Sequence, residues 1–521
     1  MPRDFFRGRH AGLLVPLFSV PSRESWGIGE FGDLPKLGVW LADAGYSFVQ
    51  LLPLNEMAEG QNSPYSALSA MAMDPIFISP AAVPEVQALG GEALLTDAER
   101  GQLEAARHAS GVDYTAVRAV KNRALRAAFE RFFEHEWRPQ TDRAKRLRMF
   151  AGRERWWLDE YALFRALHAR NEGRYWREWD PPLRDREPAA LQAARESLDV
   201  EILFYTYLQW LAAGQWSRAR EATEVGVFGD FPFMVSGDSA DVWSRQEDFR
   251  LDASVGAPPD AFSETGQDWG FPAYRWPEIA AGGFRWLAAR ARRYAALYDG
   301  YRVDHLVGFF RTYVRETDGR AAFVPATEPD QIAQGVRVLE VLSAPGARLT
   351  AEDLGVIPEF VRDTLRRLEI PGYKVLRWER EWDEAGQPFR DPAEYPRCSV
   401  ATSGTHDTET LAEWWDSAPA EERHAVASIV CMNPPGCNPD EPFTPATRDA
   451  ILQVLFASAA DVVLLPIQDV FGWRDRVNTP AVISEDNWTW RLPWPVEDLE
   501  TEPAARDRAV FTRALAERCR R

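Results

Sequence analysis

Cysteine is scarce in this sequence. Only four occur in 521 residues: Cys398, Cys431, Cys437 and Cys519. No two of them form a Cys-x-x-Cys pair, so the sequence gives no support for a zinc site or a redox-active dithiol. So few thiols in a long chain are typical of a reducing compartment. We therefore expect a cytoplasmic protein whose cysteines are buried or inert.

Long apolar runs are also lacking. No stretch reaches the roughly 18 uninterrupted apolar residues that a membrane-spanning helix needs. The apolar segment from Gly12 to Val20 is interrupted by Pro16, and no small-residue cleavage site follows it. We interpret this segment as the first strand of the fold rather than as a signal peptide, and we expect no membrane partner.

Positive charge is in deficit. The chain has 60 Lys and Arg against 79 Asp and Glu, which gives a formal net charge of −19. This balance argues against nucleic acid or an anionic membrane as the main partner. The sequence also lacks a phosphate-binding Gly-x-x-x-x-Gly-Lys-Ser/Thr loop, a Gly-x-Ser-x-Gly elbow and a His-Glu-x-x-His zinc motif. A hydrophobic content of 45% is ordinary for a folded globular protein and excludes a disordered chain.

Short apolar runs recur along the chain, and each ends in polar residues. Helical patterns lie between several of them, such as Ile357–Leu368 and the stretch from Thr444, a candidate N-cap, to Ser458. Alternation of strand and helix predicts a parallel sheet, and at this length we expect a closed (β/α)8 barrel of the TIM type. The runs are Phe48–Leu54, Val225–Val235, Gly300–Phe310, Arg348–Gly355, Ser399–Asp407 and Asp461–Asp469.

A stretch of different character covers about residues 86–215. Thr96 and Glu99 form a capping-box pattern that predicts the start of a helix. Further on, apolar residues repeat at helical spacing, namely Val117, Val120, Ala124, Ala128 and Phe132. We therefore expect one barrel spanning residues 1–521, interrupted by this large, mainly helical insertion and by further loop insertions.

Three acids follow apolar runs in polar company: Asp304, Glu352 and Asp407. Arg302 lies on the same face of an extended segment as Asp304, so we expect its charge to keep Asp304 ionised. Two of only seven histidines, His305 and His406, adjoin two of these acids. Paired carboxylates are typical of glycoside cleavage, and the 21 tryptophans suit stacking on sugars. Carboxylates could also bind Mg²⁺ or Ca²⁺, but the neighbouring histidines and tryptophans favour a sugar over a metal.

A series of motifs along nearly the whole chain is similar to one known family. The motifs are Ser63-Pro-Tyr-Ser66, Gly229-Asp-Phe-Pro232, Asp238-Ser-Ala-Asp-Val-Trp243, Pro258-Pro-Asp260, Gly266-Gln-Asp-Trp269, Arg302-Val-Asp-His305, Ala351-Glu-Asp-Leu-Gly355, Gly404-Thr-His-Asp407, Asn478-Thr-Pro480 and Asn487-Trp-Thr-Trp-Arg491. In this order and spacing the chain resembles the amylomaltases, the 4-α-glucanotransferase family of the α-amylase superfamily. It departs from the family pattern at Leu306 and Val307, where an aromatic residue and then an arginine are usual.

The resemblance implies a role for individual residues. Asp304 matches the nucleophile of the family, Glu352 the acid/base, and Asp407 the third acid that holds sugar hydroxyls. The remaining matches are Arg302 and His406 beside the donor site, and Tyr65, Asp230, Asp260, Gln267, Trp269 and Asn478 along the glucan groove. From sequence alone, core packing of Tyr65 and Trp269 and a plain turn at Asp260 remain open alternatives.

The implied reaction is retaining transfer of α-1,4-glucan segments between malto-oligosaccharides, glucose and other α-glucans, with no cofactor and no metal. Such a mechanism predicts that the carboxyl groups of Asp304 and Glu352 lie about 5–5.5 Å apart. Two alternatives stay open: an α-glucan hydrolase that uses the same three acids, and a non-catalytic glucan-binding protein.

Overall fold

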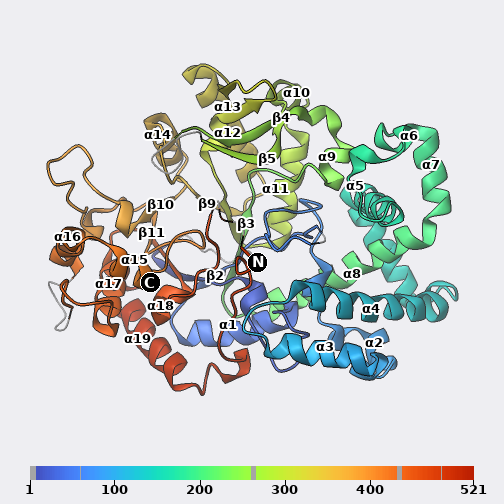
Figure 1. Ribbon diagram of the computed structural model, residues 1–521, viewed down its shortest axis with the longest axis horizontal. Helices are drawn as coiled ribbons and strands as arrows, with labels where there is room; N and C mark the ends of the chain where they lie inside the picture. The colour runs from blue at the N-terminus through green and yellow to red at the C-terminus, as the bar shows by residue number, and fades with distance from the viewer. Residues whose placement is uncertain (1–7, 59, 260–265, 431–436, 481, 483) are drawn as a thin grey trace.

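Eight short parallel strands close into a barrel at the centre of the molecule (Figure 1). The computed structural model describes residues 8–58, 60–259, 266–430, 437–480, 482 and 484–521. The strands follow one another around the barrel in chain order, and the last pairs with the first. They are β1 (His10–Leu14), β2 (Phe48–Gln50), β3 (Gly226–Phe231), β6 (Gly300–Val303), β9 (Arg348–Ala351), β10 (Gly372–Val375), β11 (Ser399–Thr402) and β12 (Val462–Pro466). The predicted (β/α)8 barrel is confirmed.

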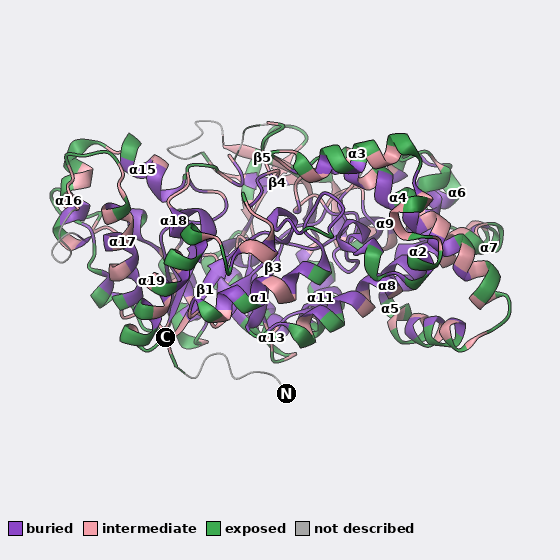
Figure 2. Ribbon diagram, turned by 90° about the horizontal axis from the view of Figure 1, so that it is seen from below, coloured by how far each residue is buried: buried purple, intermediate pink, exposed green. Residues whose placement is uncertain are grey.

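The barrel strands are buried on both faces, as the purple strands β1 and β3 show in Figure 2. All residues of β3, β6, β11 and β12 are buried. This explains why the strands appear in the sequence as continuous apolar runs rather than as alternating patterns.

The strands end sooner than the apolar runs that predicted them. In the Gly300–Phe310 run, β6 ends at Val303, and residues 307–310 form the short helix α12.

Among the described residues, seven α-helices lie between β2 and β3, on one side of the barrel in Figure 1. The Thr96 capping box is present at the start of α3, with the hydroxyl accepting from the Glu99 backbone N–H. Every apolar residue of the predicted periodic set on α4 is buried, from Val117 to Phe132. The helices are α2 (Pro84–Ala88), α3 (Asp97–His108), α4 (Tyr114–Phe132), α5 (Asp142–Arg170), α6 (Pro181–Arg184), α7 (Pro188–Ser197) and α8 (Asp199–Ala222).

A second, antiparallel sheet was not predicted. Its strand order is β5-β4-β7-β8, with β4 (Phe249–Ala257) and β5 (Gln267–Tyr274) inserted after β3, and β7 (Thr312–Glu316) and β8 (Ala321–Val324) inserted after β6. Most residues of β4 and all those of β8 are partly or fully exposed. Polar residues interrupt β4, and the apolar run of β8 is only four residues long. The pattern that reveals the barrel strands therefore does not detect them.

The remaining helices surround the barrel, and those nearest the C-terminus lie opposite α2–α8 in Figure 1. The two helices predicted at Ile357–Leu368 and after Thr444 are α14 and α17. In α17 the Thr444 side chain accepts from the backbone N–H of Thr447. The bounds are α1 (Leu34–Asp43), α9 (Ala240–Ser244), α10 (Trp276–Ala281), α11 (Arg285–Leu297), α12 (Val307–Phe310), α13 (Glu328–Ser343), α14 (Glu359–Arg367), α15 (Leu411–Ser417), α16 (Ala420–Val430), α17 (Pro445–Ala457), α18 (Ile467–Phe471) and α19 (Pro503–Cys519).

Two further findings bear on the expectations from composition. Among the described residues, no helix has both the length and the apolar character needed to cross a bilayer. Cys398 and Cys519 are free thiols. Cys437 takes part in a disulfide. This disulfide was not expected, because the low cysteine content is typical of a reducing compartment.

Candidate active site

The three predicted acids follow barrel strands at one mouth of the fold. Asp304 comes directly after β6, Glu352 directly after β9, and Asp407 five residues after the end of β11. The first two positions are fixed by the backbone, because the Glu352 N–H donates to the carbonyl of Val303 over 3.0 Å. In a (β/α)8 barrel, the ends of different strands supply the side chains of a shared site.

Arg302 on β6 connects these acids. Its Nη2 atom lies 2.9 Å from Asp304 Oδ1 and 2.8 Å from Glu352 Oε2, while Nη1 lies 2.6 Å from Asp230 Oδ2 on β3. Asp304 Oδ1 and Glu352 Oε2 are therefore at most 5.7 Å apart, the sum of their two contacts with Nη2. Arg302 is only 2% exposed, whereas the side chains of Asp304 and Glu352 are 22% and 21% exposed. Both carboxyl groups thus share one buried cation and still face solvent.

Tyr65 links Asp230 to the third acid. Its hydroxyl donates to Asp230 Oδ2 over 2.7 Å and lies 3.0 Å from Nε2 of His406. The Tyr65 and His406 rings stack at a centroid distance of 5.6 Å and an interplanar angle of 17°. Tyr65 is half-buried beside the acids, so plain core packing does not describe its position.

Asp407 is held by two side chains. Asn478 Nδ2 donates to Asp407 Oδ1 over 2.6 Å, and His406 Nε2 lies 3.1 Å from Oδ2. Arg476 donates to the Asp407 carbonyl over 3.1 Å, which fixes the backbone as well. The Asp407 side chain is 39% exposed, so its oxygens can also accept hydrogen bonds from a ligand.

Charge at Asp407 is strongly favoured. Burial disfavours its ionised form, but His406 and the Asn478 amide outweigh burial and lower its pKa to about 2. Burial lowers the pKa of His406 as well, yet the Asp407 charge is stronger and the net shift is upward. The two side chains thus support each other as an ion pair.

The pKa values of Asp304 and Glu352 differ from what the sequence predicts. Burial, aided by the charges of Glu352 and Asp230, raises the pKa of Asp304 to about 8 against the pull of Arg302. Burial also acts on Glu352, but Arg302 and the backbone N–H of His305 lower its pKa overall. The expectation that Arg302 keeps Asp304 ionised therefore does not hold. One guanidinium serves three carboxylates, and its charge outweighs burial at Glu352 but not at Asp304.

Two predicted groove residues lie on the second sheet. Gln267 and Trp269 are both on β5, and Gln267 Oε1 accepts from the Trp269 indole N–H over 3.0 Å. The Trp269 ring meets the His305 ring edge-on, with centroids 4.8 Å apart. β5 thus brings both side chains to the segment that carries Asp304. Asp260 lies outside the described residues.

Sequence reasoning missed two contributors. His305 has a left-handed backbone (φ 41°), and its N–H donates to Glu352 Oε2 over 2.8 Å. Trp488, also left-handed (φ 67°), contacts the rings of both Tyr65 and His406 at 5.7 and 5.8 Å. Both residues belong to motifs quoted above, but a backbone conformation gives no signal in a single sequence. Left-handed non-glycine residues are often found at functional sites.

The arrangement provides two carboxyl groups across a short gap and a third whose pKa is lowered. No group of three or more His, Cys, Asp or Glu side chains among the described residues is arranged to hold a metal ion. Leu306 and Val307, the departures from the family pattern, follow Asp304 and His305 in the chain, and both are buried. They leave the three acids in place.

Comparison with known proteins identifies the family. A family model described as 4-alpha-glucanotransferase matches residues 15–497. The chain belongs to the 4-alpha-glucanotransferase family. The resemblance to the amylomaltases is thereby confirmed, and the match includes all three acids of the site.

Individual relatives of the family agree with this assignment. The 4-alpha-glucanotransferase of Thermus thermophilus is 33% identical over 539 residues, covering 98% of each chain. That of Chlamydia pneumoniae is 32% identical over 504 residues, covering 94% of this chain and 92% of the relative. An amylomaltase from Streptococcus agalactiae, solved in complex with acarbose, superposes with a TM-score of 0.82 at 26% identity. It covers 98% of this chain and 99% of its own.

Proposed function

We propose that this protein is a retaining 4-α-glucanotransferase that moves α-1,4-glucan segments from a donor malto-oligosaccharide to the 4-hydroxyl of glucose or another glucan. One observation carries the mechanism: Asp304 Oδ1 and Glu352 Oε2 lie at most 5.7 Å apart. Retaining glycosidases separate their carboxyl groups by about 5–5.5 Å, whereas inverting enzymes need about 6.5–9.5 Å to admit a water molecule.

In the first half of the reaction, Glu352 protonates the glycosidic oxygen while Asp304 attacks the anomeric carbon. A covalent glycosyl-enzyme forms and the leaving sugar departs. In the second half, Glu352 removes the proton of an incoming 4-hydroxyl, which attacks the anomeric carbon and frees Asp304. The glycosidic bond energy is conserved in the intermediate, so the reaction requires no cofactor.

The proton has to move before the bond breaks. The pKa of Asp304 is raised and that of Glu352 is lowered, which is opposite to the distribution that the attack requires. A bound donor supplies the driving force, because its glycosidic oxygen can accept a hydrogen bond from Glu352 only when that carboxyl group is protonated. We propose that donor binding transfers a proton from Asp304 to Glu352.

Asp407 and His406 have a separate task. Asp407 is ionised at any physiological pH because its pKa is lowered to about 2. A fixed carboxylate beside an imidazole can accept and donate hydrogen bonds to neighbouring sugar hydroxyls. We propose that this pair, together with Asn478 and Tyr65, orients the donor ring. Asp230, Arg302, Gln267, Trp269 and Asp260 complete the proposed set of substrate-binding residues.

Incubation with maltotriose distinguishes transfer from hydrolysis. A transferase produces glucose together with a ladder of longer malto-oligosaccharides, because the glycosyl-enzyme is intercepted by a sugar. Only shorter products are expected of a hydrolase, and no products of a glucan-binding protein without activity. Chromatography of the products after timed incubation gives the answer.

Replacement of the proposed nucleophile tests the assignment of roles. We expect Asp304→Asn to reduce kcat by about 10⁴-fold or more, because the covalent intermediate can no longer form. The variant should remain folded and should still bind glucans. An unchanged rate would reject Asp304 as the nucleophile.

We further propose a cytoplasmic location on the basis of the low cysteine content. Fractionation of the source cells with an antibody against the protein tests this location. The disulfide at Cys437 is unusual for a reducing compartment, which makes this test necessary. Recovery of the protein outside the cytoplasmic fraction would contradict the proposal.

A further inference from the structure

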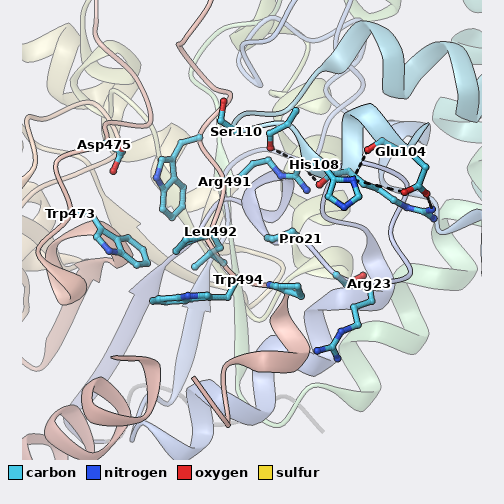
Figure 3. A pocket seen from close by; sticks show the side chains of 16 residues that line it. Pro21, Arg23, Glu104, His108, Ser110, Trp473, Asp475, Arg491, Leu492 and Trp494 are labelled. Carbon is cyan, nitrogen blue, oxygen red and sulfur yellow. Dashed lines mark hydrogen bonds and ion pairs between the residues drawn. The ribbon is translucent and has the colours of Figure 1, made fainter. Parts of the chain in front are cut away.

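A large cavity lies away from the three acids, none of which lines it (Figure 3). Its volume is about 830 Å³, within the usual range of ligand pockets. Four chain segments surround it: residues 21–23, the C-terminal end of α3 with the residues after it, Trp473 with Asp475, and residues 490–495. We call it the tryptophan cleft, after Trp473, Trp490 and Trp494 in its lining.

The three indole rings form one wall. The Trp473 ring centroid lies 5.7 Å from that of Trp490 and 5.7 Å from that of Trp494. Phe471 stacks against Trp473 at 4.2 Å and 6°, which holds that indole rigidly in place. Trp473 and Trp494 remain half-exposed, so the supported rings present apolar area to a ligand without having to be ordered by it.

Polar groups line the cleft beside this wall. Glu104, His108 and Arg23 lie on the side opposite Trp473 and Asp475 in Figure 3. The lining carries the acids Glu104 and Asp475 together with Arg23, Arg107 and Arg491, so charges of both signs are present. Flat apolar rings combined with mixed hydrogen-bonding groups suit a neutral, hydroxyl-rich ligand better than an ion or an apolar molecule.

The floor of the cleft is fixed by Arg491. Its Nη1 atom donates to the carbonyls of Ala106, Arg107 and Ala109 over 2.8, 3.2 and 3.1 Å. These carbonyls lie at the C-terminal end of α3, where a helix has unsatisfied acceptors. Arg491 is 9% exposed, so the guanidinium ties α3 to the tryptophan segment and preforms the cleft.

The cleft and the candidate active site share two chain segments. Trp473 and Asp475 line the cleft, while Arg476 and Asn478 on the same segment contact Asp407. Likewise, Trp490 lines the cleft two residues after Trp488, whose ring contacts His406. The cleft therefore adjoins the site along both segments.

We propose that the tryptophan cleft is a second binding site for α-1,4-glucans, distinct from the site of the three acids. This inference rests on the proposed function, because it takes the occupant to be the same class of sugar that the enzyme processes. A long glucan held in the cleft raises the effective concentration of its other segments near the acids. Short substrates such as maltotriose gain nothing from it.

The test uses maltoheptaose as the probe and calorimetric titration as the measurement. In the Asp304→Asn background, where turnover is removed, we expect two classes of binding site. Addition of Trp494→Ala should weaken one class by about tenfold or more and leave the other unchanged. Asp475→Ala, at an exposed position, should weaken the same class without removing an aromatic ring. Trp156→Ala serves as the matched control, since Trp156 is an exposed tryptophan of α5 outside the cleft.

In the active enzyme, we expect Trp494→Ala to raise KM for soluble amylose several-fold while kcat/KM for maltotriose stays within about twofold of its value. A single class of sites in the Asp304→Asn protein would overturn the proposal. So would an isotherm that neither Trp494→Ala nor Asp475→Ala changes. Failure of the proposed function gives a different result: the unaltered enzyme would then form no ladder from maltotriose, whatever the cleft binds.

Discussion

At the scale of single residues, Arg302 sets the charge balance of the site. Its guanidinium is the shared cation of Asp230, Asp304 and Glu352, with contacts of 2.6–2.9 Å. A planar group with several donors can bridge three carboxylates, whereas a lysine ammonium is a single point charge. The identity of this residue therefore affects both the spacing of the two central carboxyl groups and their pKa values.

Arg302→Lys tests this role. We expect kcat on maltotriose to fall by about 10²-fold or more, because a lysine cannot hold Asp304 and Glu352 at their present separation. Steady-state kinetics measures the effect. Arg311→Lys, at a half-buried arginine that lies over Phe323, is the control and should retain nearly full activity. Equal losses in both variants would contradict the proposed role.

The pKa shifts predict opposite effects of two amide substitutions on stability. The pKa of Asp304 is raised from 3.8 to about 8, so folding takes up a proton between these values and stability falls as pH rises from about 4 to 8. Asp304→Asn removes this proton uptake. The variant should melt at a higher temperature than the unaltered protein at about pH 7, with a gap that shrinks toward pH 4.

Asp407→Asn is the matched comparison. The pKa of Asp407 is lowered to about 2, so its charge stabilises the fold above about pH 4, and this stabilisation disappears as pH falls through about 2. The variant should melt at a lower temperature at about pH 7. Thermal melts of both variants at several pH values provide the measurement. Shifts of the same sign in the two variants would show that burial and pairing do not act as described.

At the scale of secondary-structure elements, the sequence predicts buried strands better than exposed ones. The runs that contain β6, β9 and β11 are detectable because parallel barrel strands are apolar on both faces. The acids at their ends could then be placed at one mouth of the barrel. β10 was not predicted, because its four residues Gly372–Val375 include Lys374 and form no apolar run. The antiparallel sheet was not predicted either, because polar residues interrupt β4 and begin β5 and the apolar run of β8 is short. The support that β5 gives to Trp269 was therefore not predicted.

The order of the pKa values also could not be predicted from the sequence. A pairwise rule places Arg302 beside Asp304 and predicts an ionised acid. The outcome depends on how many carboxylates share the guanidinium and how deeply they are buried, which only the packed structure determines.

Helix α4 supports the site through one hydrogen bond. The Tyr114 hydroxyl at its first residue donates to the carbonyl of Trp488 over 2.8 Å, and the Trp488 ring contacts Tyr65 and His406. Tyr114→Phe should cost about 1 kcal/mol of stability. It should also raise KM for maltotriose, because the left-handed segment at Trp488 loses an anchor. Comparison of KM and unfolding free energy with those of Thr96→Ala, which weakens the cap of α3, separates the two effects. An unchanged KM would limit Tyr114 to a structural role.

At the scale of the whole molecule, the net charge of −19 should have little effect on the binding of a neutral substrate. Added salt screens charge–charge interactions, and a sugar without charge experiences no steering that salt could remove. We expect KM for maltotriose to change less than about twofold between low and high sodium chloride. Melting temperature should rise with salt, because screening reduces repulsion among the excess acids. A KM that increases steeply with salt would indicate a charged substrate.

The pairing of β1 with β12 has a consequence for folding during synthesis on the ribosome. The barrel closes only when Val462–Pro466 has emerged and aligned with His10–Leu14, and Asn478 reaches Asp407 later still. A nascent chain of about 450 residues can therefore hold Arg302, Asp304 and Glu352 and yet lack a closed wall around them. Activity should appear late in translation and abruptly, rather than growing as successive strands are added.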